Sequence, residues 1–283
     1  MFNTNFFIIL INLLLKLFSK KVKKITLLDH NGIKIENYPE SEWYLSPFPK
    51  QKGLPFNSDN LTTVNRYKFL ENEKFKESLK VSEKRWCING NEKTRDISWR
   101  LHVMLWSVSL ALSDIDSEND IFIECGTGKG YMAAGICNFF NWGKSKPIMY
   151  LIDSFKSTMP EKDGSQIEDG KKLFVYSDGD EEVKHYFKKY DNIKILTGLI
   201  PEILKVLPDK KTIKFLHLDL NSAIAEFSAL VYFKSKFKKG SIILFDDYGG
   251  YGAEDQAEIH EKFAVELNSN LLILPTGQAL LIL

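Results

Sequence analysis

The sequence has 283 residues, of which 44% are hydrophobic and 13% aromatic, so it can bury one substantial core with a small appended element. Its 38 Lys and Arg nearly cancel its 37 Asp and Glu. No overall positive field attracts phosphates, and no nucleic-acid partner is expected. Three cysteines are neither an even set nor at metal-ligand spacing, which favours a reducing, cytoplasmic compartment over a disulfide framework.

Residues 1–24 form an apolar and basic segment. Residues 6–15 are almost wholly apolar, and lysines follow at positions 16, 20, 21, 23 and 24. The apolar run is short for a bilayer span, and a cleaved signal peptide would carry its charge before that run. This pattern predicts a helix, which would either contact a membrane peripherally or pack on protein. A transmembrane anchor is the least favoured alternative. Whether the chain forms a homo-oligomer stays open.

We expect residues 25–85 to form an N-terminal extension or lid. Four prolines with interleaved aromatics between residues 38 and 56 break regular structure. Helical spacing of apolar residues then predicts helices over 65–84 and, more strongly, 98–112. The main domain is expected to cover 86–283.

From Asp120 onward, short apolar runs alternate with helical stretches, which predicts parallel strands joined by crossover helices. The expected strands are 121–125, 148–153, 193–197, 214–220 and 242–246, and the expected helices lie near 131–140, 180–190, 222–237 and 254–267. Two final runs, 271–275 and 278–283, flank Thr276-Gly277 and predict a tight hairpin. The fold class is therefore α/β and Rossmann-like: a seven-stranded sheet with an antiparallel last strand, as in class I methyltransferases, plus an N-terminal helical extension.

A glycine-rich turn follows the first expected strand, where residues 124–130 read Glu-Cys-Gly-Thr-Gly-Lys-Gly. Its glycines allow the backbone to approach a ligand closely. A nicotinamide-binding fingerprint would have its third glycine one position later, and a pyrophosphate disfavours a carboxylate before the turn. Glu124 instead favours a cationic group, such as the methionyl ammonium of S-adenosylmethionine; a structural turn without a ligand is the alternative. The candidate contacts here are Glu124, Gly126, Thr127, Gly128 and Gly130.

Asp153 ends the second expected strand and is followed by Ser154 and Phe155. An acid at this position can accept hydrogen bonds from both ribose hydroxyls of an adenosine, and ligands of open α/β sheets bind at the carboxyl ends of the strands. We therefore expect these three residues to contact the same cofactor. A role for Asp153 as a turn or cap residue is equally open.

Two later strands also end in carboxylates, at Asp219 and at Asp246-Asp247. If these strands are neighbours, three like charges converge at one edge of the sheet and repel unless a cation offsets them. Mg²⁺ is the simplest candidate, because it prefers carboxylate and carbonyl oxygens. Capping of the following segment by Asp246 or Asp247 is the alternative.

Several motifs together resemble the macrocin O-methyltransferase (TylF-like) family. They are Trp99-Arg-Leu-His102, Phe122-Ile-Glu-Cys-Gly126, Leu151-Ile-Asp-Ser-Phe155, Phe215-Leu-His-Leu-Asp-Leu-Asn221, Gly240-Ser-Ile-Ile-Leu-Phe-Asp-Asp-Tyr-Gly249 and Leu274-Pro-Thr-Gly-Gln278. The resemblance runs from about residue 99 to the C-terminus. Many family members have a second Asp and then a Tyr where this chain has Asn221 and Ala223, so the acceptor pocket is expected to differ.

The resemblance implies a methyltransferase domain over 86–283 that binds S-adenosylmethionine and a divalent metal and methylates hydroxyls, notably of sugars. It implies Asp219, Asp246 and Asp247 as metal ligands. The partner would be a small-molecule or glycan acceptor.

The catalytic candidates are Asp246 and His102. His102 and Arg100 lie on the helix before the first strand and could face the cleft, although a helical histidine is more often structural. His217 lies within a buried strand and is expected to pack or hydrogen-bond inside the sheet. Two other readings stay open: a noncatalytic binding subunit of the same fold and, less favoured, a nucleotide-dependent oxidoreductase.

Overall fold

A computed structural model describes residues 24–28, 34–39, 56–58, 61–63, 67–86, 96–143, 146–155, 180–250 and 252–283. The chain divides into two compact units, residues 1–54 and 55–283. In the first unit β1 (Lys24–Leu28) pairs antiparallel with β2 (Lys34–Pro39). The helix expected over residues 1–24 falls, apart from Lys24, outside the described residues. No helix in the described ranges combines the length and apolar character needed to cross a membrane.

The second unit is built on a seven-stranded sheet with the order β10-β11-β9-β8-β5-β6-β7. The strands are β5 (Asp120–Cys125), β6 (Ile148–Asp153), β7 (Ile193–Thr197), β8 (Thr212–Leu218), β9 (Ile242–Phe245), β10 (Leu271–Ile273) and β11 (Ala279–Ile282). β11 lies between β9 and β10 and is antiparallel to both, whereas the five strands from β9 to β7 run parallel. The expected Rossmann-like α/β sheet with an antiparallel last strand is therefore confirmed. A separate small hairpin pairs β3 (Phe56–Ser58) with β4 (Leu61–Thr63).

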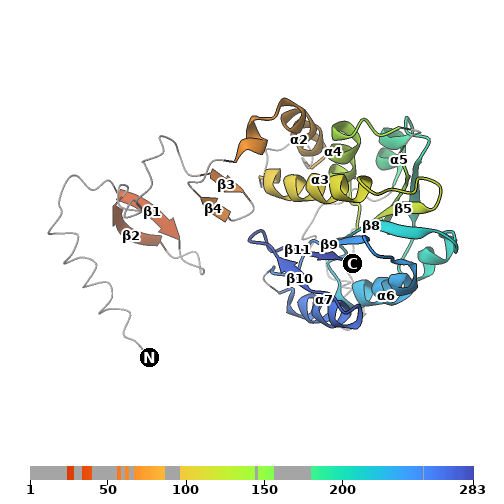
Figure 1. The fold of residues 1–283 in the computed structure, drawn as a ribbon. Helices are drawn as coiled ribbons and strands as arrows, with labels where there is room; N and C mark the ends of the chain where they lie inside the picture. Colours follow the sequence, from red (N-terminus) through yellow and green to blue (C-terminus); the bar gives the residue numbers. More distant parts are fainter. Residues whose placement is uncertain are drawn as a thin grey trace. The chain divides into compact units, whose positions relative to one another are not determined.

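Helices cover both faces of this sheet (Figure 1). The helices are α2 (Glu73–Trp86), α3 (Ser98–Leu112), α4 (Tyr131–Phe139), α5 (Glu181–Phe187), α6 (Ala223–Phe233) and α7 (Glu254–Glu266), with short 3-10 helices at Lys68–Glu71, Glu202–Val206 and Lys234–Lys236. α3 and α4 lie on one face, and α6 and α7 on the other (Figure 1).

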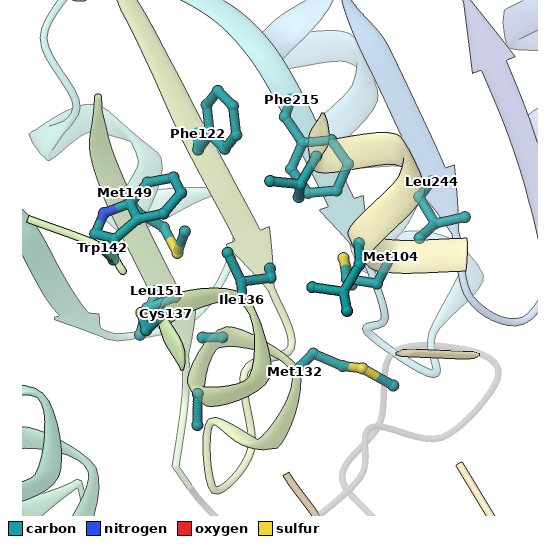
Figure 2. Packing of buried hydrophobic residues seen from close by; sticks show 14 of the residues in the cluster. Met104, Phe122, Met132, Ile136, Cys137, Trp142, Met149, Leu151, Phe215 and Leu244 are labelled. Carbon is teal, nitrogen blue, oxygen red and sulfur yellow. The ribbon is translucent and has the colours of Figure 1, made fainter. Parts of the chain in front are cut away.

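The alternation of side chains along the central strand β5 creates two hydrophobic cores. Phe122 points into one core, while Ile121 and Ile123 belong to the other, because successive side chains of a strand face opposite sides. Every residue of β5 is buried, as expected for a parallel strand with helices on both faces. Figure 2 shows Phe122 with Met104 of α3 and Ile136 of α4 in the first core.

α2 is part of the second unit and packs closely on α4. A Cβ added at Gly135 of α4 would lie 2.3 Å from Ser82 Oγ, so only glycine allows this approach. One turn away along the same pair of helices, the Ser78 hydroxyl bonds Asn138 Oδ1 at 2.8 Å. α2 was expected to belong to an extension ending at residue 85, and it instead contributes the buried Phe75 to the first core.

Candidate active site

Glu124 and His217 are direct neighbours across the central strand pair. The register of β5 and β8 places them opposite each other, and that of β8 and β9 pairs Leu218 with Phe245. Asp219 and Asp246 therefore follow their strands at the same edge of the sheet. The expectation that the fourth and fifth strands are neighbours is confirmed, and it brings acids from three strands together.

His217 links two of these acids. Its Nδ1 lies 3.2 Å from Glu124 Oε1, and its Nε2 lies 3.6 Å from Asp246 Oδ1. Burial disfavours the imidazolium, but the hydrogen bonds and charges of Asp246 and Glu124 outweigh it and raise the pKa of His217 to about 10. The buried imidazolium therefore balances part of the negative charge at this edge.

Asp246 has cationic and neutral donors around it. Arg100 of α3 forms an ion pair with Oδ2, and the Gln278 amide donates to Oδ1 at 2.9 Å. Burial alone would raise the pKa of Asp246, but the charge of Arg100, the charge and hydrogen bonding of His217 and the hydrogen bond from Gln278 lower it well below its ordinary range. Asp246 is thus held as a carboxylate in a buried position.

Asp219 has the opposite electrostatic environment. Burial and then the charges of Asp246 and Asp247 raise its pKa well above the ordinary value. His217, Asp219 and Asp246 each offer a ligand atom, and these atoms all lie within 4.8 Å of one another. The two carboxylates can hold a divalent cation, and its positive charge would favour ionised Asp219. His217 could add a nitrogen ligand only after its imidazolium loses a proton.

The glycine-rich turn is packed against the end of β8. Gly126 has a positive φ of 88°, and a Cβ there would lie 1.6 Å from the backbone oxygen of Asp219. Side chains other than hydrogen are therefore excluded at this position. The close approach also ties the turn to the strand end that carries Asp219.

Asp153 holds the same turn from the neighbouring strand. Its Oδ2 accepts the backbone N–H of Gly128 at 2.7 Å, and its Oδ1 accepts that of Phe155 at 2.8 Å. Burial raises the pKa of Asp153, partly offset by these hydrogen bonds. Asp153 thus acts as a turn residue, and its carboxylate, which has about four lone-pair sites, can still accept from a ligand hydroxyl.

One carboxylate oxygen of Glu124 accepts no hydrogen bond from the described residues. Its Oε2 is buried and has no hydrogen-bond partner in the part of the chain that the structure describes. Burial is the main reason that the pKa of Glu124 is raised. A buried carboxylate oxygen without a donor costs free energy, which a cationic donor such as an ammonium would offset.

The eight expected cofactor residues all lie at the carboxyl ends of β5 and β6. They are Glu124, Gly126, Thr127, Gly128, Gly130, Asp153, Ser154 and Phe155. Thr127 is buried beside Glu124, with its hydroxyl 3.4 Å from the Glu124 backbone oxygen.

The structure does not place His102 with the carboxylates. Its ring stacks on Phe69 at a centroid distance of 3.9 Å, and its other ring contacts among the described residues are with Phe75 and Trp99. Burial lowers the pKa of His102. Arg100, two residues earlier on α3, is the side chain that reaches Asp246, because residues two apart on a helix point in different directions.

A family model described as macrocin-O-methyltransferase (TylF) matches residues 111–271, more than half of the chain. The chain belongs to the macrocin-O-methyltransferase (TylF) family. It is therefore an O-methyltransferase that uses S-adenosylmethionine as methyl donor, and neither an oxidoreductase nor a noncatalytic subunit fits this membership.

Solved structures support the fold of this family member. The O-methyltransferase NovP is 18% identical, with a TM-score of 0.54 over 72% of this chain and 87% of NovP. The calicheamicin methyltransferase CalS11 is 14% identical, with a TM-score of 0.50 over 82% of this chain and 99% of CalS11. A search of curated protein sequences gives no match.

Two contacts of this TylF-family site were not expected from the sequence. Gln278 was noted only as part of a motif, yet it donates to Asp246. His217 was expected to pack or hydrogen-bond inside the sheet, and it does hydrogen-bond there, but its partner is Glu124, and Asp246 lies 3.6 Å from its other nitrogen. Side chains two residues apart on a strand point to the same side of the sheet. This rule could have placed His217 on the same side as Asp219.

Proposed function

We propose that this chain transfers the methyl group of S-adenosylmethionine to a hydroxyl of a sugar or glycan-like small molecule, with help from Mg²⁺. One observation carries the proposal: Glu124, His217, Asp219 and Asp246 converge at the carboxyl edge of the central strands. The family supplies the methyl-transfer reaction, and this cluster lies beside the glycine turn where a donor would bind.

Glu124 would bind the methionyl ammonium of the donor. Its unpartnered Oε2 supports this role, because an ammonium can satisfy a buried carboxylate oxygen. Asp153 would accept from the ribose hydroxyls with the lone-pair sites that its backbone donors leave open. The backbone of Gly126, Gly128 and Gly130 would allow close approach, with Thr127, Ser154 and Phe155 lining the same loop pair.

Asp219, Asp246 and Asp247 would hold the divalent metal. The raised pKa of Asp219 beside two other acids supports this role, because a cation would offset their mutual repulsion. When bound, the metal would lower the pKa of an acceptor hydroxyl. Arg100 and Gln278 keep Asp246 ionised and fixed in direction, so the chain supplies a prepositioned carboxylate. Asp246 is the catalytic residue in this proposal, and His102 is less suited because its ring lies among aromatics.

A sugar-like acceptor follows from the resemblance of the sequence motifs to this family, which implies methylation of hydroxyls, notably of sugars. The apolar and basic segment 1–24 makes a membrane-associated glycan worth including among the substrates tested. The hydroxyl itself would be aligned with the donor methyl by the binding site, since alignment of two reactants supplies much of the rate of such a transfer.

The test uses the purified full chain with methyl-labelled S-adenosylmethionine and fractionated cell extracts, with and without a chelator. We expect label in a hydroxyl of a low-molecular-weight or glycan product, with loss on chelation and recovery on addition of Mg²⁺. Full activity in the chelated enzyme would overturn the metal role. Label found only on nitrogen or carbon would overturn the hydroxyl acceptor.

A further inference from the structure

The last turn of α2 contacts the glycine turn of the candidate donor site through Arg85. This arginine is only 8% exposed, and its Nε donates to the backbone oxygen of Lys129 at 2.6 Å. Lys129 stands between Gly128 and Gly130. A buried guanidinium from a helix far upstream in the chain therefore holds a peptide group inside the glycine turn.

The rest of the Arg85 guanidinium lies against α5. Its Cζ lies 4.2 Å from the centroid of the Tyr186 ring, in a cation–π arrangement. Its Nη2 lies 3.6 Å from Glu182 Oε1. Lysine has neither the planar group that stacks in this way nor several donors in a fixed geometry, so the site is built for arginine.

The peptide that Arg85 holds joins Lys129 to Gly130, and the Gly130 N–H of the same peptide bonds the Thr127 backbone oxygen at 2.8 Å. Gly130 has a positive φ of 73°, and a Cβ there would lie 2.5 Å from the Phe187 ring. The turn thus needs glycine and carries the backbone freedom that glycine brings. Asp153 holds the Gly128 end of the turn, and the hydrogen bond from Arg85 to the Lys129 oxygen restricts the other end before any ligand binds.

We propose that Arg85 is a positioning residue of the donor site: it preorganises the glycine turn, so that S-adenosylmethionine binds without first ordering this backbone. Preorganisation raises affinity because the ordering cost is removed from binding. The inference rests on the proposed role of the glycine turn in donor binding. It assigns α2 a function in cofactor affinity, whereas its sequence had suggested only an extension or lid.

The experiment compares S-adenosylmethionine binding by isothermal titration calorimetry in the full chain and two variants, Arg85→Ala and Arg85→Lys. We expect the dissociation constant to rise about tenfold in both, which corresponds to about 1.4 kcal/mol. The KM for S-adenosylmethionine, measured with the cell-extract fraction that accepts the labelled methyl group, should rise in parallel in both variants.

Ser78→Ala is the matched control. It removes the Ser78–Asn138 hydrogen bond from the same α2–α4 contact but leaves the glycine turn untouched. We expect this control to lower the thermal midpoint and to keep the wild-type dissociation constant. If Arg85→Ala fails to fold, the dissociation constant of the milder Arg85→Lys variant is compared with that of the wild type instead.

The outcomes separate this inference from the proposed function. Wild-type affinity in a folded Arg85 variant overturns the positioning role, as does an equal weakening in Ser78→Ala. Absence of S-adenosylmethionine binding in the wild-type chain would instead overturn the proposed donor site.

Discussion

His217 Nδ1 and Glu124 Oε1 lie 3.2 Å apart between the two central strands of the sheet. The same imidazole reaches toward Asp246 with its other nitrogen. One buried ring therefore connects the acid proposed for the donor ammonium with an acid proposed for the metal. A substitution of either acid should therefore change the electrostatic environment of the other through this ring.

Replacing Glu124 tests the donor site. Glu124→Gln removes the negative charge that we assign to the methionyl ammonium, and hydrogen bonds to charged groups contribute about 1.5–3 kcal/mol. We expect the dissociation constant of S-adenosylmethionine, measured by calorimetry, to rise by at least about tenfold. Glu258→Gln is the control, because Glu258 is an exposed partner of Lys262 on α7. Unchanged affinity in Glu124→Gln would contradict the assigned role.

The two metal-site aspartates should differ in their effect on the metal-free protein. Asp246→Asn leaves Arg100 buried without its charge partner, which typically costs about 3–5 kcal/mol. Asp219→Asn removes a carboxylate whose ionisation is disfavoured by burial and by Asp246 and Asp247. We expect the free energy of unfolding to fall in the first variant and to stay equal or rise in the second.

Both aspartate variants should nevertheless bind Mg²⁺ more weakly than the wild type by calorimetry. Urea unfolding in the presence of a chelator measures the stability difference. A loss of stability in metal-free Asp219→Asn as large as that in Asp246→Asn would contradict the electrostatic account. Wild-type metal affinity in both variants would remove these residues from the metal site.

Gly126 should tolerate no side chain. Gly126→Ala would place its Cβ 1.6 Å from the Asp219 backbone oxygen and in a left-handed conformation, so a backbone must move. We expect the free energy of unfolding to fall by more than about 1 kcal/mol. Binding of S-adenosylmethionine should also be lost. In the control Gly143→Ala, the nearest atom would be 3.7 Å away, and little change is expected. Equal thermal midpoints for the two variants would refute this close approach.

The charge of His217 should make stability depend on pH. Although burial opposes its charged form, contact with Asp246 and Glu124 raises the pKa of His217 to about 10, above the value of about 6.5 for an unfolded chain. The stabilisation from this proton is fully present below pH 6.5 and is lost as the pH rises through about 10.

The measurement compares metal-free wild type with His217→Gln by urea unfolding between pH 7 and pH 9.5. The stability advantage of the wild type should shrink with rising pH, by at most about 1.4 kcal/mol per pH unit. A difference that stays constant over this range would mean that His217 is neutral in the folded protein.

Local patterns in the sequence predicted the strands of the sheet, which the structure confirms, and the positions of most candidate site residues, whose binding roles remain proposals. Short buried runs such as Ile121 to Cys125 and the intervening helical periods predicted all seven strands and their helices. Glu124, the glycine turn and the strand-terminal acids followed from the rule that ligands bind at the carboxyl ends of parallel strands. These signals are readable because strand burial and turn geometry depend on neighbouring residues.

Only the tertiary structure decided which side chains surround those acids. Arg100 and Gln278 reach Asp246 from positions 146 and 32 residues away, and Arg85 reaches Lys129 across 44 residues. His102 instead packs among aromatics. Such contacts depend on how each helix is rotated and which strands are adjacent. These properties arise from packing between distant segments, and no local pattern of residues encodes them.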